Sequence, residues 1–196
     1  MLKEKQIYEM EIDVDDFNKE RFKSSAKVYG LIFNFCLRKM IDSLNAPSKT
    51  LYKKEHESIT FNRLSHEVHK SIDEESCTYL GHICKFVHVS LINNAIMSSV
   101  GFFNKWKRGR RKLGTTIPFP NGIPKRCMRY FVIGSEDYPI SFSPKGLYLR
   151  RLARFKVLGS YEEKGYLMGT YSKVRIFYKN LTCKWYCQFN IKNKKD

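Results

Sequence analysis

The most informative segment of the chain covers residues 173–192 and reads KVRIFYKNLTCKWYCQFNIK. From Trp185 to Ile191, hydrophobic residues at the odd positions alternate with a more polar set at the even positions. Residues 173–179 repeat this alternation with the hydrophobic set at the even positions, and residues 180–182 have the composition of a turn. Because side chains on a strand alternate between its two faces, the segment predicts an antiparallel β-hairpin with one buried face.

The first residues of the chain show the same alternation. Over residues 5–13, Tyr8, Met10 and Ile12 form the predicted buried face of a strand. An isolated strand leaves its backbone groups unpaired, so this strand is expected to join the C-terminal sheet. Further strands of that sheet are predicted at Cys127–Ile133, Ile140–Ser143, Leu147–Leu152 and Phe155–Leu158.

Three helices are predicted between the first strand and the others. Asp15 or Asp16 can cap the first helix, which Asn45-Ala46-Pro47 ends. The second is expected from about residue 60 to 72, and the third from near Asp73 into a basic run. The predicted fold class is α+β, a small antiparallel OB-like β-barrel with a three-helix insertion after its first strand. The expected divisions are residues 1–14 for the first strand, 15–114 for the insertion and 115–196 for the rest of the barrel.

Charge is distributed unevenly along the chain. The 36 Lys and Arg against 19 Asp and Glu give a net charge of +17. Residues 1–75 hold 13 basic and 14 acidic side chains, whereas residues 76–196 hold 23 basic and 5 acidic ones. Self-repulsion on this scale favours a polyanionic partner, and nucleic acid is the partner we expect. A membrane surface is disfavoured because neither terminus carries a basic amphipathic helix.

Composition also bounds the location of the protein. A hydrophobic content of 42% excludes a disordered chain, and no apolar run approaches the roughly 18–20 residues of a membrane span. The segment Met1–Glu11 has no apolar core and does not read as a signal peptide. Six widely spaced cysteines are typical of reduced thiols, so a cytoplasmic protein is expected.

Two basic clusters are the candidate binding residues. At the end of the third helix, six of the eight residues 105–112 are basic. This is more positive charge than is needed to offset the negative end of the helix dipole. The candidates there are Lys105, Lys107, Arg108, Arg110, Arg111 and Lys112. On the strands the candidates are Lys145, Arg150, Arg151, Arg154 and Lys156, joined by Arg126 and Arg129. The alternatives are a solvated helix end and ordinary strand-edge charge. Tyr148 is interpreted as a core residue, with base stacking as the alternative.

Four short motifs can be compared with a known family: FNFCL at 33–37, LINNA at 91–95 with FFNKWKR at 102–108, IPF at 117–119, and KVRI at 173–176 with KWYCQF at 184–189. Together they resemble the N-terminal half of transposon-encoded TnpB proteins and their relatives, the compact type V CRISPR effectors. The resemblance implies the wedge and recognition modules of that family, with a structured guide RNA and target DNA as partners. It also implies nucleic-acid contacts from Asn34 and Arg38, with helix capping or packing as the alternative for Asn34.

The family continues into a RuvC-like nuclease domain, whereas this sequence stops at Asp196. Cleavage by two metal ions needs several converging carboxylates, and the five acidic residues of 76–196 lie in adjacent pairs or at the end. No catalytic residue, metal ligand or cofactor is therefore expected. A nuclease would come from a separate RuvC-like subunit, or be absent, and a second copy of the chain is another partner that the resemblance allows.

The leading hypothesis is a non-catalytic RNA-binding protein that resembles the guide-binding half of such an effector. One alternative is a helix-turn-helix DNA-binding regulator, although the basic excess lies outside the first two predicted helices. The other alternative is a structural ribonucleoprotein subunit without target recognition.

Overall fold

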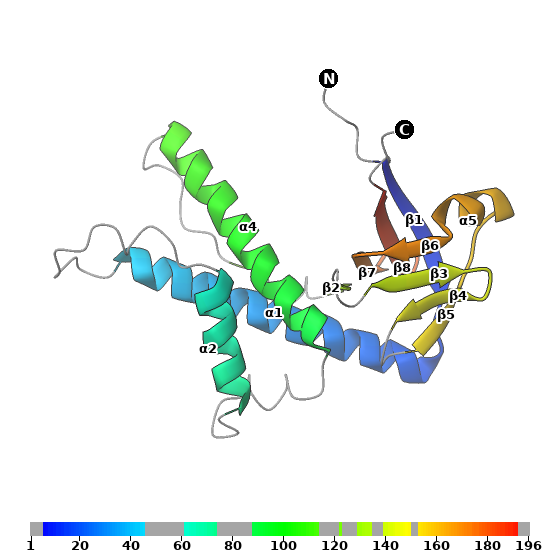
Figure 1. Ribbon diagram of the computed structural model, residues 1–196, viewed down its shortest axis with the longest axis horizontal. Coiled ribbons are helices and arrows are strands. Elements are labelled where there is room, and N and C mark those ends of the chain that lie inside the picture. Colours follow the sequence, from blue (N-terminus) through cyan, green and yellow to red (C-terminus); the bar gives the residue numbers. More distant parts are fainter. Residues whose placement is uncertain are drawn as a thin grey trace. The chain divides into compact units, whose positions relative to one another are not determined.

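The computed structural model describes residues 6–45, 61–73, 88–113, 122, 129–134, 139–149 and 153–191. Within these ranges the chain forms four helices and eight strands (Figure 1). In chain order they are β1 (Gln6–Asp13), α1 (Asp16–Asn45), α2 (Phe61–Asp73), α4 (Val89–Leu113), β2 (Tyr130–Ile133), β3 (Ile140–Ser143), β4 (Gly146–Leu149), β5 (Ala153–Val157), α5 (Tyr161–Leu167), β6 (Gly169–Tyr171), β7 (Val174–Lys179) and β8 (Lys184–Ile191). The expected α+β class is confirmed.

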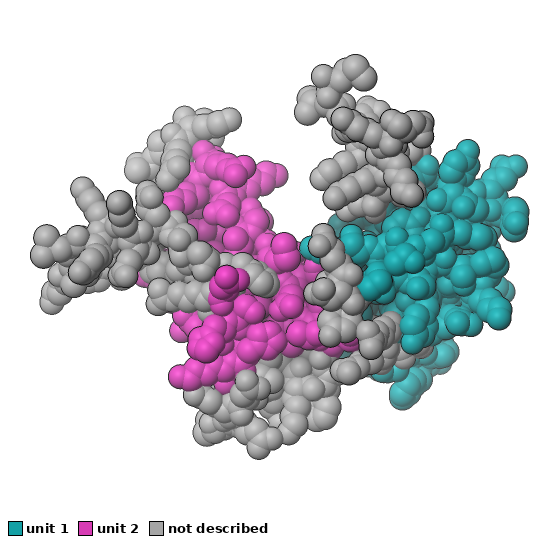
Figure 2. Space-filling view, viewed as in Figure 1, with its two compact units in different colours: residues 1–26, 129–196 teal, residues 27–128 magenta. Residues whose placement is uncertain are grey.

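The chain divides into two compact units (Figure 2). We call residues 1–26 with 129–196 the sheet unit, and residues 27–128 the helical unit. The divisions expected from the sequence were at residues 14/15 and 114/115. The first division lies later because the opening turns of α1 belong to the sheet unit, where Phe22 is fully buried.

All strands of the sheet unit are antiparallel and follow the order β2-β7-β8-β1-β5-β4-β3-β6. The predicted hairpin is confirmed, with Lys179 opposite Lys184 at its closed end. The N-terminal strand joins the C-terminal sheet as expected, because β1 pairs with β8 along its length and with β5 at Ile12 and Asp13. Strand β1 therefore connects the two halves of the sheet.

The sheet is open but strongly rolled. Its edge strands β2 and β6 are not paired with each other in the described residues, so the predicted barrel is not confirmed. However, the rings of Phe142 on β3 and Phe189 on β8 lie with centroids 5.5 Å apart. Three strands separate β3 from β8, and in a flat sheet the two strands would be about 19 Å apart. The sheet therefore curls until its halves face each other around a shared core.

Phe22 fills the centre of that core. Its ring centroid lies 5.4 Å from that of Phe131 on β2, 4.8 Å from that of Phe155 on β5, and 5.2 Å from that of Trp185 on β8. The inward-facing residues of β1 and β8, among them Met10, Ile12, Cys187 and Phe189, are buried as the alternation predicts. One helical side chain thus joins strands from both halves of the rolled sheet.

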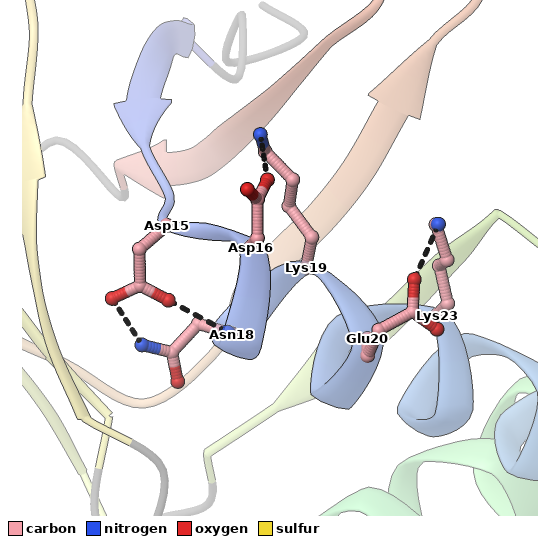
Figure 3. Close-up of polar contacts among 6 residues, drawn as sticks. All are labelled: Asp15, Asp16, Asn18, Lys19, Glu20 and Lys23. Atoms are coloured by element: carbon pink, nitrogen blue, oxygen red, sulfur yellow. Dashed lines mark hydrogen bonds and ion pairs between the residues drawn. The ribbon is translucent and has the colours of Figure 1, made fainter.

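Asp15 caps α1, which settles the choice left open by the sequence (Figure 3). One carboxylate oxygen of Asp15 accepts a hydrogen bond from the Asn18 backbone N–H at 2.7 Å, and the other accepts from the Asn18 side chain at 3.0 Å. Asp16 then pairs with Lys19 at 2.8 Å, and Glu20 with Lys23 at 2.6 Å. The charges in these opening turns are neutralised locally.

The helical unit has a core of its own. Side chains from three helices are buried in it, including Val28, Ile32, Leu64, Val68, Leu91 and Ala95. The Tyr29 hydroxyl bonds the Ser98 hydroxyl across α1 and α4 at 2.6 Å. Phe103 is buried, whereas the side chain of the neighbouring Phe102 is 44% exposed. The α4 helix begins at Val89 and not near Asp73, and His88 caps it by accepting from the Ser90 backbone N–H at 3.1 Å.

Candidate nucleic-acid interface

The first group of predicted cations lies in the helical unit. Lys105, Lys107 and Arg108 project from the C-terminal half of α4, and Arg38 is exposed on α1. None of these four makes an ion pair with a carboxylate of the described residues. The helix continues through Arg110, Arg111 and Lys112, whose side chains lie outside the described residues.

The second group lies in the sheet unit. Lys145 occupies the turn between β3 and β4, Arg154 and Lys156 share one face of β5, and Arg129 precedes β2. All four are exposed. None has an ion-pairing carboxylate in the part of the chain that the structure describes. The remaining candidates Arg126, Arg150 and Arg151 lie outside it.

Tyr148 belongs to the surface beside this second group. It pairs in register with Arg154 on β5 and with Ser141 on β3, and its side chain is 44% exposed. The Arg154 guanidinium carbon lies 6.0 Å from the centroid of the Tyr148 ring. The interpretation of Tyr148 as a core residue was wrong because Leu147 and Leu149 take the inward positions of β4.

Five other described lysines are paired with carboxylates. The described ion pairs are Lys19–Asp16, Lys23–Glu20, Lys39–Glu67, Lys179–Glu9 and Lys184–Glu11. Hydrogen bonds to the glutamates raise the pKa of Lys179 and of Lys184. The eight described candidates therefore differ from these five lysines in carrying charge that no described carboxylate offsets. Uncompensated cations of this kind create the positive potential that attracts a polyanion.

Asn34 has a structural contact. A Cβ added at Gly122 would lie 2.4 Å from the Asn34 side-chain oxygen, so the carboxamide lies directly against this glycine. The Gly122 backbone has a φ of +77°, a conformation that residues other than glycine rarely adopt. The close approach favours the packing alternative for Asn34, and its contact with nucleic acid stays a prediction.

The described residues contain no group of three or more His, Cys, Asp and Glu side chains arranged to hold a metal ion. Burial raises the pKa of the Cys187 thiol to about 12, so this thiol stays protonated at neutral pH. No described helix is both long enough and apolar enough to cross a membrane.

Sequence reasoning missed an aromatic row on the outer face of the sheet. Tyr130 on β2, Phe177 on β7 and Tyr186 on β8 are adjacent in register. The available signal was the hairpin itself, where Phe177 and Tyr186 occupy positions that the alternation assigns to the more polar face. We call Tyr130, Phe177 and Tyr186 the outer aromatic row.

No model of a known protein family matches the chain, and a search of curated proteins finds no match to it.

Proposed function

We propose that the protein is a non-catalytic RNA-binding protein that holds a structured guide RNA and the duplex of that guide with target DNA. This is the role of the guide-binding half of the TnpB-like and type V CRISPR-like effectors that the sequence resembles. One observation carries the proposal. The eight described candidate cations lack a carboxylate partner among the described residues, whereas five other lysines are paired.

Binding in this proposal is electrostatic and depends on shape. Proteins recognise A-form duplexes by the geometry of their backbone, which basic side chains reach without reading the bases. Each phosphate neutralised by Lys or Arg releases condensed counterions, which favours association at low salt. The cations of α4 and those around β5 are the groups that make these contacts.

The rolled sheet fits the same proposal. An OB-like barrel serving as the wedge module would need β2 and β6 to approach each other. A Cβ added at Gly134, just after β2, would lie 2.5 Å from the carbonyl oxygen of Ser172, just after β6. This approach supports a barrel-like wedge, although the edge strands are not paired in the described residues.

In this proposal residues 76–196 contribute contacts to nucleic acid and no nuclease chemistry. Residues 76–196 contain only five acidic side chains, too few and too dispersed for a two-metal centre. In this proposal any cleavage of target DNA depends on carboxylates from outside residues 76–196.

Sequencing the RNA that co-purifies with the full chain tests the proposal. The expected result is one defined, structured RNA species, bound more tightly than unrelated transcripts of the same length. A heterogeneous mixture of fragments would contradict a guide-specific role and favour a structural ribonucleoprotein subunit. A duplex-DNA footprint that persists after RNase treatment would favour the DNA-binding regulator instead.

A further inference from the structure

The outer aromatic row lies on the face of the sheet that points away from its core. Tyr130 is opposite Phe177, and Phe177 is opposite Tyr186, so the three rings cross three neighbouring strands. The neighbouring residues along these strands, Phe131 on β2 and Ile176 on β7, point inward and are fully buried. Each ring of the row is partly exposed.

Two of the rings already have a stacked geometry. The Phe177 and Tyr186 ring centroids are 5.9 Å apart with an interplanar angle of 27°. Aromatic pairs within the core of this unit meet at larger angles, such as 73° for Phe22 with Phe131 and 53° for Phe22 with Phe155. Phe177 and Tyr186 therefore lie with their ring planes nearly parallel on neighbouring strands.

Two cations lie over rings of the row. The Arg175 guanidinium carbon lies 4.5 Å from the Tyr130 ring centroid and 5.4 Å from that of Phe177. The Lys179 ammonium lies 4.5 Å from the Tyr186 ring centroid. Lys179 is paired with Glu9, which offsets its charge, but Arg175 forms no ion pair with any carboxylate that the structure describes. Arg175 is the cation that remains available to a phosphate.

We propose that the outer aromatic row is a stacking platform for a single-stranded segment of RNA. Every nucleobase has a π-face, so exposed aromatic rings beside a cation hold unpaired bases with little dependence on sequence. Arg175 contacts the phosphate next to the stacked bases. The proposal rests on the proposed function for its polyanionic partner, and it adds recognition of bases to the recognition of the backbone.

Stacking and phosphate contact differ in their response to salt. Counterion release weakens as the salt concentration rises, whereas contact between a base and a ring does not depend on counterions. A strand held by both contacts therefore retains part of its affinity in high salt. A duplex cannot use the platform, because its bases are already stacked on one another.

The test measures binding of the full chain to an oligouridylate strand and to an abasic strand of the same length and charge. We expect the strand with bases to bind at least about fivefold more tightly, since stacking of one base on an aromatic ring contributes about 1 kcal/mol or more. The difference should persist in high salt. Equal affinity for the two strands would overturn the platform, while binding of a structured RNA in the same preparation would leave the proposed function intact.

A double variant locates the contact. The double variant carries Phe177→Leu and Tyr186→Leu, which keep apolar side chains on β7 and β8. It should abolish the preference for the RNA strand that has bases. Tyr166→Leu is the matched control, because Tyr166 is a 77% exposed aromatic residue on α5, outside the row. A preference that survives in the double variant would remove the row from the interface, and the comparison of strands on the unaltered protein does not depend on how the variant folds.

Discussion

The ring of Phe22 packs edge-on against the indole of Trp185, with ring centroids 5.2 Å apart. Phe22 lies in the second turn of α1, and Trp185 lies on β8, inside the segment that most clearly predicts the hairpin. Both side chains are buried. The contact explains why the opening turns of α1 belong with the sheet and not with the other helices.

Phe22→Ala should therefore strongly destabilise the sheet unit. Loss of a fully buried phenyl ring that contacts three other rings costs about 3–5 kcal/mol of unfolding free energy. Urea denaturation followed by near-ultraviolet circular dichroism measures the change. Phe17→Ala is the matched control, because Phe17 lies in the same helix but is 72% exposed, and should cost less than about 1 kcal/mol. Equal costs for the two variants would contradict the assignment of Phe22 to the core.

The N-cap of α1 makes a smaller contribution that can be measured separately. Asp15→Ala removes the acceptor for the Asn18 backbone N–H and should lower the free energy of unfolding by about 1 kcal/mol. Asp15→Asn keeps an acceptor oxygen and should stay close to the wild type. Asp16→Ala breaks only an exposed pair with Lys19 and should leave the stability nearly unchanged. A larger loss in Asp16→Ala than in Asp15→Ala would show that Asp15 is not the cap.

Structural elements that depend on short-range sequence patterns could be predicted. The hairpin, the joining of β1 to the C-terminal sheet and the span of α1 follow from alternation, unpaired backbone groups and a capping residue. Each of these signals is local, or depends on a rule that holds for any strand.

The missed elements were short or depended on tertiary contacts. The sequence of α5 carries a capping box, with Ser160 and Glu163 bonding each other's backbone N–H, but the helix has only seven residues. β6 has three residues and is fixed by its pairing with β3. The roll of the sheet depends on contacts such as Phe142 with Phe189, which no local pattern encodes.

The basic candidates could be predicted as a set, but their lack of carboxylate partners could not. The double variant Arg154→Gln, Lys156→Gln tests whether these two cations contact phosphates. For an A-form RNA duplex, the slope of log affinity against the logarithm of the salt concentration should become shallower by about 1–2 units. Lys19→Gln with Lys23→Gln is the matched control, since Asp16 and Glu20 already offset these lysines. Fluorescence anisotropy over a range of salt concentrations gives both slopes. A slope that falls equally in the two variants would show that ion pairing does not distinguish the groups.

Burial of Cys187 predicts a loss of stability in alkaline solution. The pKa of this thiol rises from 9.0 to about 12 on folding, because burial disfavours the thiolate. Between these values the unfolded chain releases the proton while the folded protein keeps it, so the free energy of unfolding falls as pH rises. The wild type should lose about 1 kcal/mol per pH unit more than Cys187→Ala above pH 9. Urea denaturation of both proteins at several alkaline pH values checks this, and parallel pH profiles would contradict it.

The close approach of the ends of β2 and β6 can be tested by substituting Gly134. Its φ is +100°, and an added Cβ would lie 2.5 Å from the Ser172 backbone oxygen, closer than real Cβ contacts allow. Gly134→Ala therefore combines backbone strain with a clash that only separation of β2 from β6 relieves, and it should cost about 2 kcal/mol or more. Gly165→Ala is the control, because Gly165 lies in α5 with no atom within 4 Å of an added Cβ, and alanine there should stabilise the helix. Thermal denaturation compares the two, with hydrogen exchange at β2 and β6 as the local measurement. Faster exchange at both edges in Gly134→Ala is the expected result, and unchanged exchange there would show that the edges do not depend on each other.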